Sequence, residues 1–332
     1  MSRFHVRPLT LVVTAIAGVS LACGGSSSGP PSPTLTIAKT STTSGDGQTD
    51  SVLSTLKNPI RVVVTLGTPQ VGTTVTWATA GPGASVTPLQ SITDANGIAT
   101  TTWKLGHVSG AQTATASLSS ATGSPVTFTA TATPGVRTQM IQPAGDGQAW
   151  MIGTVLPQPL AVTVADQYGN GVAGTAVAWQ VTSGSASVNP TNPTSNAGGV
   201  AQTSLTLGNT PGPITITATN ALLSGSPQSF SATAQAIPTT AAVTVGPGIQ
   251  FKSNRNSSTD PATDTIAAGG SVTWTWAANS IGHSVRSTGT STFPSSVVMT
   301  TGTYAVTFNS AGTYTYNCSV HGSSMAGTIV VR

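Results

Sequence analysis

Glutamate is absent from the sequence, and charged residues of every kind are scarce. The chain has 332 residues, of which 11 are Lys or Arg and 7 are Asp or Glu, so that 5% are charged. An ordinary soluble domain contains about 25%. Because long helices favour Ala, Leu, Glu, Lys and Arg, this composition argues against helical bundles and against the α/β enzyme folds.

Clusters of one charge sign are also missing. The formal net charge is +4, and nine basic residues remain against seven acidic ones if Arg3 and Arg7 are removed with a signal segment. The remaining basic residues are scattered, whereas nucleic-acid binding normally needs a clustered basic patch. We therefore expect no nucleic-acid partner.

Cysteine and histidine are few enough for each to need an explanation. The chain has 2 cysteines, Cys23 and Cys318, and 4 histidines. An exported protein normally uses its cysteines in disulfides. If Cys23 carries a lipid, Cys318 has no partner, and a bound metal is the natural reason for a lone thiol. His5 lies in the signal segment, and His107 follows Gly106 in an expected turn, where we predict a solvated side chain.

The abundant residues suit strands and turns. The chain has 37 Gly and 22 Pro, and its apolar residues alternate with Thr and Ser in short runs. Thr and Val favour strands, and Gly and Pro favour turns. The sequence thus predicts an all-β protein, and since a domain takes about 100–150 residues, it predicts two or three domains.

Residues 1–22 have the features of a secretion signal. Arg3 and Arg7 precede an apolar stretch at 9–21. This stretch is shorter than the about 20 residues that span a membrane comfortably. No later segment is apolar enough to span one. From the signal-like segment we expect the chain to be exported.

Cys23 is followed by a Gly/Ser/Pro-rich segment, which we expect to be a tether at 23–34. The arrangement resembles a bacterial lipoprotein signal, which implies that Cys23 is lipidated and anchors the chain to a membrane. Residues 20–22, Ser-Leu-Ala, would also suit ordinary signal cleavage.

Two stretches of the sequence repeat at a distance of about 100 residues. Gly-Asp-Gly-Gln occurs at 45–48 and again at 145–148, and Trp77 corresponds to Trp179. Solenoid units are much shorter, so this period predicts two whole domains, and we expect the two tryptophans in their cores. The predicted domains are residues 35–134 and 135–236.

Each repeat contains short alternating runs separated by turn residues. Examples in the first repeat are residues 60–66, 73–78, 99–105 and 126–133. This pattern is typical of an antiparallel β-sandwich. The order of the motifs resembles bacterial immunoglobulin-like domains of the invasin type, which implies two immunoglobulin-like β-sandwiches.

The last predicted domain, residues 237–332, does not repeat the first two. Cys318, His321 and Met325 follow the spacing Cys-x2-His-x3-Met, and His283 lies upstream. Two imidazoles, a thiolate and a thioether are the ligand set of a blue copper centre. One loop after a strand could present three of these ligands to one ion. Strand-like runs are expected at 270–276, 304–309, 312–318 and 327–331.

This domain resembles the cupredoxins, particularly plastocyanin, amicyanin and pseudoazurin. It shares a His-x-Val sequence at His283, a Tyr-x-Cys-x-x-His sequence ending at His321, and Met-x-Gly-x-Ile starting at Met325. The resemblance implies a cupredoxin Greek-key β-sandwich that holds one type 1 copper per chain. It also implies that His283, Cys318 and His321 are equatorial ligands and that Met325 is axial.

Two positions beside the first histidine depart from the plastocyanin pattern. Ser284 stands where plastocyanins commonly have an Asn whose side chain ties the two ligand loops together. Gly282 stands in place of a Pro. The first departure puts that supporting hydrogen bond in question.

The small number of histidines and cysteines excludes most copper enzymes. Multicopper oxidases and copper nitrite reductases need many more histidines, and the dinuclear site of terminal oxidases needs a second nearby cysteine. A glycosidase needs two carboxylates at a cleft, whereas we expect Asp46 and Asp146 to cap strand edges in turns. The sequence therefore predicts an electron-transfer protein rather than an enzyme.

The combined pattern predicts an exported protein of the periplasm or cell surface that carries one electron at a time. The immunoglobulin-like domains would form a stalk for the copper domain. The cupredoxin resemblance implies that the electron passes through the exposed edge of His321, beside a docking patch of Gly282, Gly322 and Ala326 for a redox protein partner. The alternative is a surface adhesion or structural protein whose copper domain sequesters metal or stabilises the chain.

Overall fold

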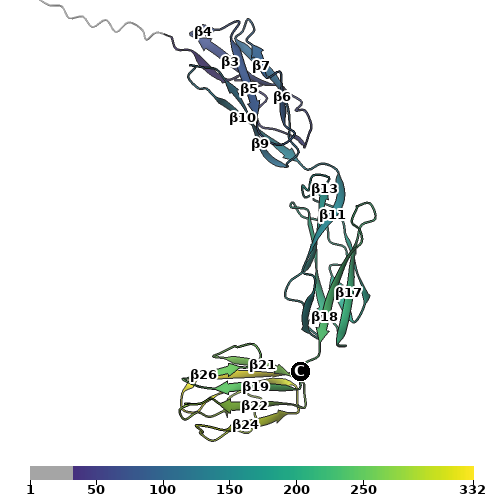
Figure 1. Cartoon of the computed structure of the whole chain (residues 1–332), viewed down its shortest axis with the longest axis vertical. Coiled ribbons are helices and arrows are strands. Elements are labelled where there is room, and N and C mark those ends of the chain that lie inside the picture. Colours follow the sequence, from purple (N-terminus) through teal and green to yellow (C-terminus); the bar gives the residue numbers. More distant parts are fainter. Residues whose placement is uncertain (1–32) are drawn as a thin grey trace, which may run out of the picture.

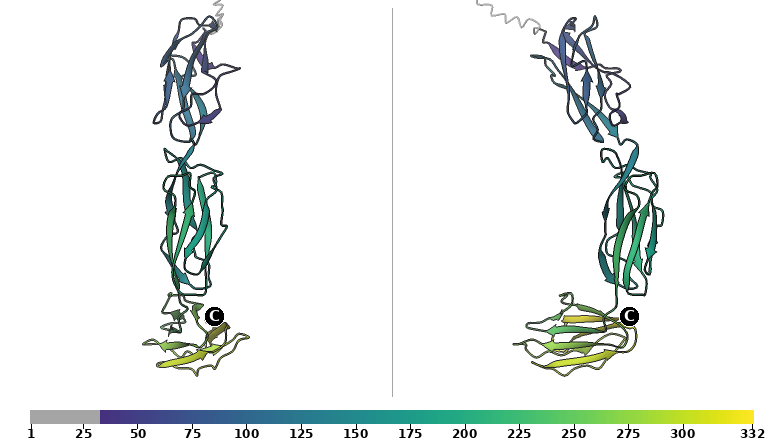
Figure 2. Two further views of the ribbon diagram at one scale, coloured as in Figure 1. Left: turned by 90° about the vertical axis from the view of Figure 1, so that its right-hand side faces the viewer. Right: turned by 45° about the vertical axis from the view of Figure 1, so that its right-hand side comes forward.

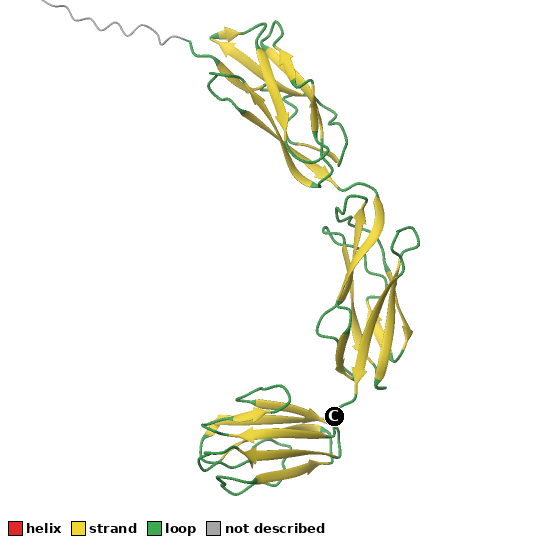
Figure 3. Cartoon of the chain, viewed as in Figure 1, coloured by secondary structure: helices red, strands yellow, loops and turns green. Residues whose placement is uncertain are grey.

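Three β-sandwiches follow one another along the chain (Figure 1). The computed structural model describes residues 33–332, and within this range the chain forms strands, turns and loops but no helix (Figure 3). The all-β class predicted from the sequence is therefore confirmed. None of the described residues belongs to a helix that could cross a membrane. The expected signal segment, Cys23 and most of the tether lie outside the described residues.

The first sandwich forms because its strands bury every second side chain. Along β10 (Val126–Thr133), buried and exposed residues alternate over the whole strand. One sheet has the order β1-β3-β8-β6 with β4 beside β3, and the other has the order β2-β10-β9-β5-β7. The other strands are β1 (Thr36–Lys39), β2 (Gln48–Ser51), β3 (Ile60–Leu66), β4 (Thr68–Pro69), β5 (Thr74–Thr79), β6 (Ser85–Thr87), β7 (Gln90–Ile92), β8 (Ile98–Lys104) and β9 (Gly110–Ser117).

The second sandwich repeats this layout with two four-stranded sheets, β11-β13-β16-β15 and β12-β18-β17-β14. As β2 does on β10, β12 pairs in parallel with the last strand of its sandwich, β18. The strands are β11 (Arg137–Ala144), β12 (Gln148–Met151), β13 (Leu160–Asp166), β14 (Ala178–Ser183), β15 (Ala186–Asn189), β16 (Val200–Leu207), β17 (Gly212–Thr219) and β18 (Gln228–Gln235).

Each of these two sandwiches has a tryptophan at the centre of its core. Trp77 is 1% exposed and Trp179 is 3% exposed. Their rings lie 6.0 Å from Phe128 and 5.1 Å from Phe230, measured between ring centroids. The expectation that both tryptophans pack inside is therefore confirmed.

The third sandwich has two four-stranded sheets, β20-β19-β22-β24 and β21-β26-β25-β23. Its core contains many aromatic side chains, and Trp274, Phe251 and Tyr316 are almost fully buried. The strands are β19 (Thr240–Val245), β20 (Phe251–Ser253), β21 (Ala262–Ile266), β22 (Gly270–Trp276), β23 (Arg286–Ser287), β24 (Thr303–Phe308), β25 (Gly312–Cys318) and β26 (Gly322–Val331).

The first two sandwiches lie end to end with their strands along the length of the molecule, and the third lies across the end of the second (Figures 1 and 2). The third sandwich is therefore the part of the described chain that lies farthest from residue 33.

Candidate metal centre

His283 is held by backbone hydrogen bonds in the connection between β22 and β23. Its N–H donates to the carbonyl oxygen of Met299 at 2.9 Å, and the N–H of Met299 donates back at 2.8 Å. This two-way bridge fixes the backbone of His283 although the residue lies outside the main strands. The imidazole itself is fully buried.

Cys318 lies at the last position of β25, in the sheet that also holds β23. The pairing of β25 with β26 is irregular there: Asn317 lies opposite Ala326, whereas Cys318 lies opposite Gly322. Three residues of β26 therefore bulge out of register, a device that redirects side chains. His321 lies in the tight turn between Cys318 and Gly322, and Gly322 has a positive φ of 60°.

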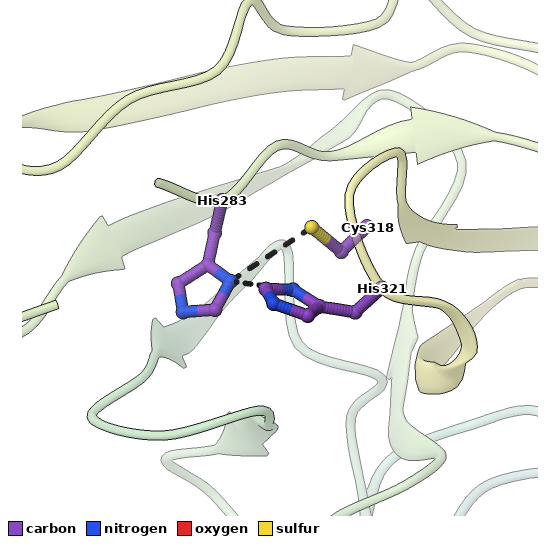
Figure 4. Close-up of side chains that lie close together, drawn as sticks. All are labelled: His283, Cys318 and His321. Atoms are coloured by element: carbon purple, nitrogen blue, oxygen red, sulfur yellow. Dashed lines mark hydrogen bonds between the residues drawn. The ribbon is translucent and has the colours of Figure 1, made fainter. Parts of the chain in front are cut away.

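Three of the predicted ligands meet in this region (Figure 4). The possible ligand atoms of His283, Cys318 and His321 all lie within 4.8 Å of one another. The two Nδ1 atoms are 3.2 Å apart, and Cys318 Sγ is 3.8 Å from His283 Nδ1. Cys318 is fully buried and His321 is half-buried, so one imidazole alone reaches the surface.

The surroundings favour the form of His283 that can bind a metal. Burial lowers the pKa of His283 below its ordinary value, and repulsion from the His321 ring lowers it further, while the carbonyl of Gly248 acts in the opposite direction. A neutral imidazole keeps a lone pair for a metal ion. Together with a thiolate, the pair forms a set suited to copper.

Two serines link the segments that carry these ligands. Ser284 N–H donates to Cys318 Sγ at 3.5 Å, and Ser284 Oγ accepts a 2.9 Å hydrogen bond from Ser319 N–H. The two hydroxyl oxygens are 2.7 Å apart. The link that plastocyanins make with an Asn is thus made here by Ser284. Its partner, Ser319, is not among the residues predicted to belong to the site. A serine directly after each of two predicted ligands, His283 and Cys318, was the available signal in the sequence.

Met325 lies on β26 and is fully buried in the same hydrophobic cluster as Cys318. Its role as axial ligand remains a prediction. Two residues further along, Gly327 leaves room for Tyr316, because a Cβ at this position would lie 2.2 Å from the phenol oxygen. The Met-x-Gly sequence thus lets a buried aromatic ring pack against the strand that carries Met325.

Exposed apolar side chains lie beside residues that flank two of the predicted ligands. Val320 precedes His321 and is 56% exposed. Val298 lies close enough that a Cβ on Gly282 would approach its Cγ1 to 3.0 Å. Gly322 and Ala326, the other residues of the predicted docking patch, are half-buried. Further exposed apolar residues of this sandwich are Ile249, Ile281 and Val297.

Sequence comparisons agree with this geometry. The profile of the copper binding proteins of the plastocyanin/azurin family matches residues 249–332, and that of the bacterial Ig-like domain (group 1) matches residues 157–235. The chain joins a bacterial Ig-like domain to a cupredoxin domain. The cupredoxin domain implies copper binding, and the His283, Cys318 and His321 side chains provide suitable donors for it. No curated protein sequence matches the chain.

Several solved structures are similar to parts of the chain. The Escherichia coli adhesin FdeC is 15% identical, covering 90% of this chain and 96% of its own, with a TM-score of 0.40. A purple cupredoxin from Nitrosopumilus maritimus is 23% identical, covering 28% of this chain and 99% of its own, with a TM-score of 0.23. The copper protein rusticyanin is also 23% identical, covering 28% of this chain and 76% of its own, with a TM-score of 0.23.

Proposed function

We propose that the protein is a type 1 (blue) copper protein of the cell envelope that carries single electrons. The observation that carries the proposal is the convergence of two Nδ1 atoms and one Sγ atom within 4.8 Å in the cupredoxin domain. A bound copper ion would supply a one-electron couple between its Cu(II) and Cu(I) forms. We propose one ion per chain, with Met325 as the axial ligand.

In electron transfer, the protein would hold the metal-donor side chains in fixed positions and expose one of them at the surface. The Met299 bridge and the Ser284–Ser319 pair restrain the two ligand segments. Fixed donors reduce the rearrangement between oxidation states, whether or not the geometry is strained. His321 is the half-buried donor, so its ring edge is the exit that we propose for the electron.

The surface around His321 suits a weak and mainly apolar encounter with a redox protein. Val298 and Val320 are more than half exposed beside the site. Small, transient contacts are typical of electron-transfer complexes. Few charges are available to steer a partner: four exposed basic residues and Asp260 are spread along the sequence of this sandwich, and Asp264 is buried. We therefore propose that docking depends little on salt concentration.

The Ig-like sandwiches would serve as a stalk in this proposal. They precede the copper domain in the chain and lie end to end (Figure 1). Export to the periplasm or cell surface, with a lipid anchor at Cys23, is the localisation that we propose. The signal-like sequence and the Ig-like domain support it.

Copper titration tests the central proposal. Visible absorption and EPR spectra recorded during addition of Cu(II) should show a strong thiolate-to-copper charge-transfer band and narrow copper hyperfine splitting, saturating at one equivalent. Cys318→Ser should lose the band while the circular dichroism of the strands stays unchanged. A pale wild-type spectrum, or a blue Cys318→Ser protein, would contradict the proposal.

A surface adhesion or structural protein is the second candidate. The first sandwich has a polar cleft of about 450 Å³ beside Arg61 and Asp94, which could hold a polar polymer. Under this candidate, the full chain with Cys318→Ser should bind envelope polymers as well as the wild type does. Loss of that binding on Arg61→Ala, with copper uptake unchanged, would support a role for the cleft.

A further inference from the structure

One loop of the second sandwich reaches across to the first sandwich. The side-chain amide of Asn170 donates to the carbonyl oxygen of His107 at 2.8 Å. Its Oδ1 accepts a hydrogen bond from the N–H of Ser109, also at 2.8 Å. Two bonds of opposite direction, made by one side chain that is 9% exposed, fix both its position and its orientation.

A ring contact reinforces these hydrogen bonds. The imidazole of His107 stacks on the phenol ring of Tyr168, with ring centroids 4.9 Å apart and planes inclined by 3°. The prediction that His107 is a solvated loop residue is therefore wrong, because its ring is half-buried against the next sandwich. Sequence patterns gave no sign of this contact, since its two rings lie in different sandwiches.

Asp166 holds the loop and the linker together. Its side chain is 1% exposed. Oδ1 accepts from the N–H groups of Tyr168 at 2.9 Å and Asn170 at 3.0 Å. Oδ2 accepts from the Asn170 amide at 2.8 Å and from the N–H of Gly135 at 2.9 Å. Gly135 lies between β10 and β11, so the linker itself is attached to the loop.

Hydrogen bonding makes this carboxylate a stable anchor. Burial alone would raise the pKa of Asp166, but hydrogen bonds from Asn170, Gly135 and Tyr168 outweigh it and lower the pKa. A charged group that accepts four hydrogen bonds is held more firmly than a neutral one.

The linker to the copper domain has no such anchor. The carbonyl of Gln235 still accepts from Ile152 in the second sandwich, and that of Pro238 already accepts from Ala267 in the third. Between them, Ala236 and Ile237 make no hydrogen bond in the described chain. Across residues 145–235, no hydrogen bond, ion pair or ring contact reaches residues 241–332.

We infer that the loop of residues 166–170 is a docking surface for the first sandwich, on its turn at His107 and Ser109. The first two sandwiches therefore move as one rigid arm, whereas the copper domain turns about Ala236 and Ile237. In the proposed function, a copper domain that rotates about this linker could meet a partner in several orientations. The rigid arm would fix its distance from the start of the first sandwich. That consequence rests on the proposed function, but the rigid arm does not.

Residual dipolar couplings test the inference without any need for copper. They would be measured for backbone N–H groups of the weakly aligned, metal-free chain. One alignment tensor should fit the first two sandwiches together, and the copper domain should need a second tensor of smaller magnitude. Separate tensors for the first two sandwiches would overturn the rigid arm, and one tensor for all three would overturn the hinge.

Substitutions identify the contact responsible. Asn170→Ala should give the first two sandwiches separate tensors, and His107→Ala should do so partly, because the backbone carbonyl of His107 remains. Gln167→Ala is the matched control, since Gln167 is exposed in the same loop and makes no hydrogen bond in the described chain. Chemical shifts within each sandwich report whether the variants stay folded. If both variants behave like the control, the loop is not the docking surface.

Discussion

The hydroxyl oxygens of Ser284 and Ser319 lie 2.7 Å apart, and each serine directly follows a predicted copper ligand. Ser284 follows His283 and is 1% exposed, while Ser319 follows Cys318. The pair therefore joins the connection between β22 and β23 to the turn that follows β25. Ser319 is exposed, so this short contact ties the buried segment after His283 to the surface turn that carries His321.

Ser284→Ala should loosen the site. The substitution removes the hydroxyl pair and leaves the N–H of Ser319 without its 2.9 Å acceptor. Ser319 is itself exposed, so water can replace the lost acceptor, and a hydrogen bond of this kind contributes about 0.5–1.5 kcal/mol. We expect the free energy of unfolding of the copper domain to fall by about this amount, and copper to be lost faster to a chelator. Denaturant unfolding and a stopped-flow chelation assay measure the two effects.

Ser323→Ala is the matched control for this change. Ser323 lies in the same ligand loop, is exposed, and makes no hydrogen bond in the described chain. Equal effects of the two substitutions would show that the hydroxyl pair does not restrain the site.

Alternation within single strands was enough to predict much of the fold. The runs expected at 60–66, 126–133, 270–276 and 312–318 coincide with β3, β10, β22 and β25. The last strand was predicted at 327–331, but β26 starts at Gly322. The bulge opposite Cys318 explains the difference. Gly322 pairs with Cys318, but the three residues that follow Gly322 are out of register and lack the alternating pattern.

Contacts between separate elements could not be predicted in the same way. The spacing of Cys318, His321 and Met325 is local and visible in the sequence. The contact of Ser284 with Ser319 depends on where the connection between β22 and β23 lies against the end of β25, and that of His107 with Tyr168 depends on how two sandwiches meet. Neither packing leaves a periodic trace in the residues concerned.

Asp264 should make the copper domain less stable as the pH rises. This carboxyl group is 1% exposed, and only Oδ1 has a partner, the hydroxyl of Ser253 at 2.8 Å. Burial raises its pKa above 3.8, although Ser253 and Arg255 act in the opposite direction. The folded state therefore binds more protons than the unfolded state between pH 3.8 and the raised pKa, and stability falls across that window.

Asp264→Asn should abolish this slope and stabilise the copper domain at neutral pH, where the wild type has to bury a charge. Denaturant midpoints measured from pH 4 to pH 8 give the comparison. Asp260→Asn is the control, since Asp260 is exposed on the same sandwich. A slope that survives in Asp264→Asn would assign the pH dependence to another group.

Asp146 should have the opposite pH dependence in the second sandwich. Its Oδ1 accepts from the N–H of Ser231 at 2.7 Å and from the Ser231 hydroxyl at 3.0 Å, so it caps a strand edge as expected. The hydrogen bond from the Ser231 N–H is the main cause that lowers the pKa of Asp146 below 3.8. Its contribution to stability is complete above pH 3.8 and is lost as the pH falls.

Asp146→Asn should therefore lower the stability of the second sandwich by about 1 kcal/mol at neutral pH and by less in acid. The equivalent turn of the first sandwich provides a comparison, because Asp46 Oδ1 accepts from Thr129 in the same way. Asp46 also forms a salt bridge with Lys39. Asp46→Asn should consequently show a dependence on salt concentration that Asp146→Asn lacks, and unfolding at two ionic strengths decides between them.

The two glycines around Asp146 have different structural roles. Gly145 has a φ of +82°, and a Cβ there would lie 2.3 Å from the carbonyl oxygen of Pro159. Gly147 has a φ of +70°, but a Cβ there would meet nothing within 4 Å. A substitution at either position strains the backbone. At Gly145 alone, the new side chain would also force the neighbouring backbone at Pro159 to move.

Gly147→Ala should cost about 1–2 kcal/mol, the strain of a left-handed residue with a side chain. Gly145→Ala should cost clearly more, because a backbone carbonyl cannot rotate away from the new methyl group as a side chain could. Amide N–H signals of residues around Trp179, followed by NMR during denaturant unfolding, report the stability of this sandwich, whose core holds that ring. Gly45 and Gly47 form the same pair in the first sandwich, where a Cβ on Gly45 would lie 2.2 Å from Pro59 O and one on Gly47 would meet nothing within 4 Å. If Gly145→Ala and Gly147→Ala lose equal stability, backbone strain alone explains the glycines of this turn and the close approach to Pro159 has no energetic role.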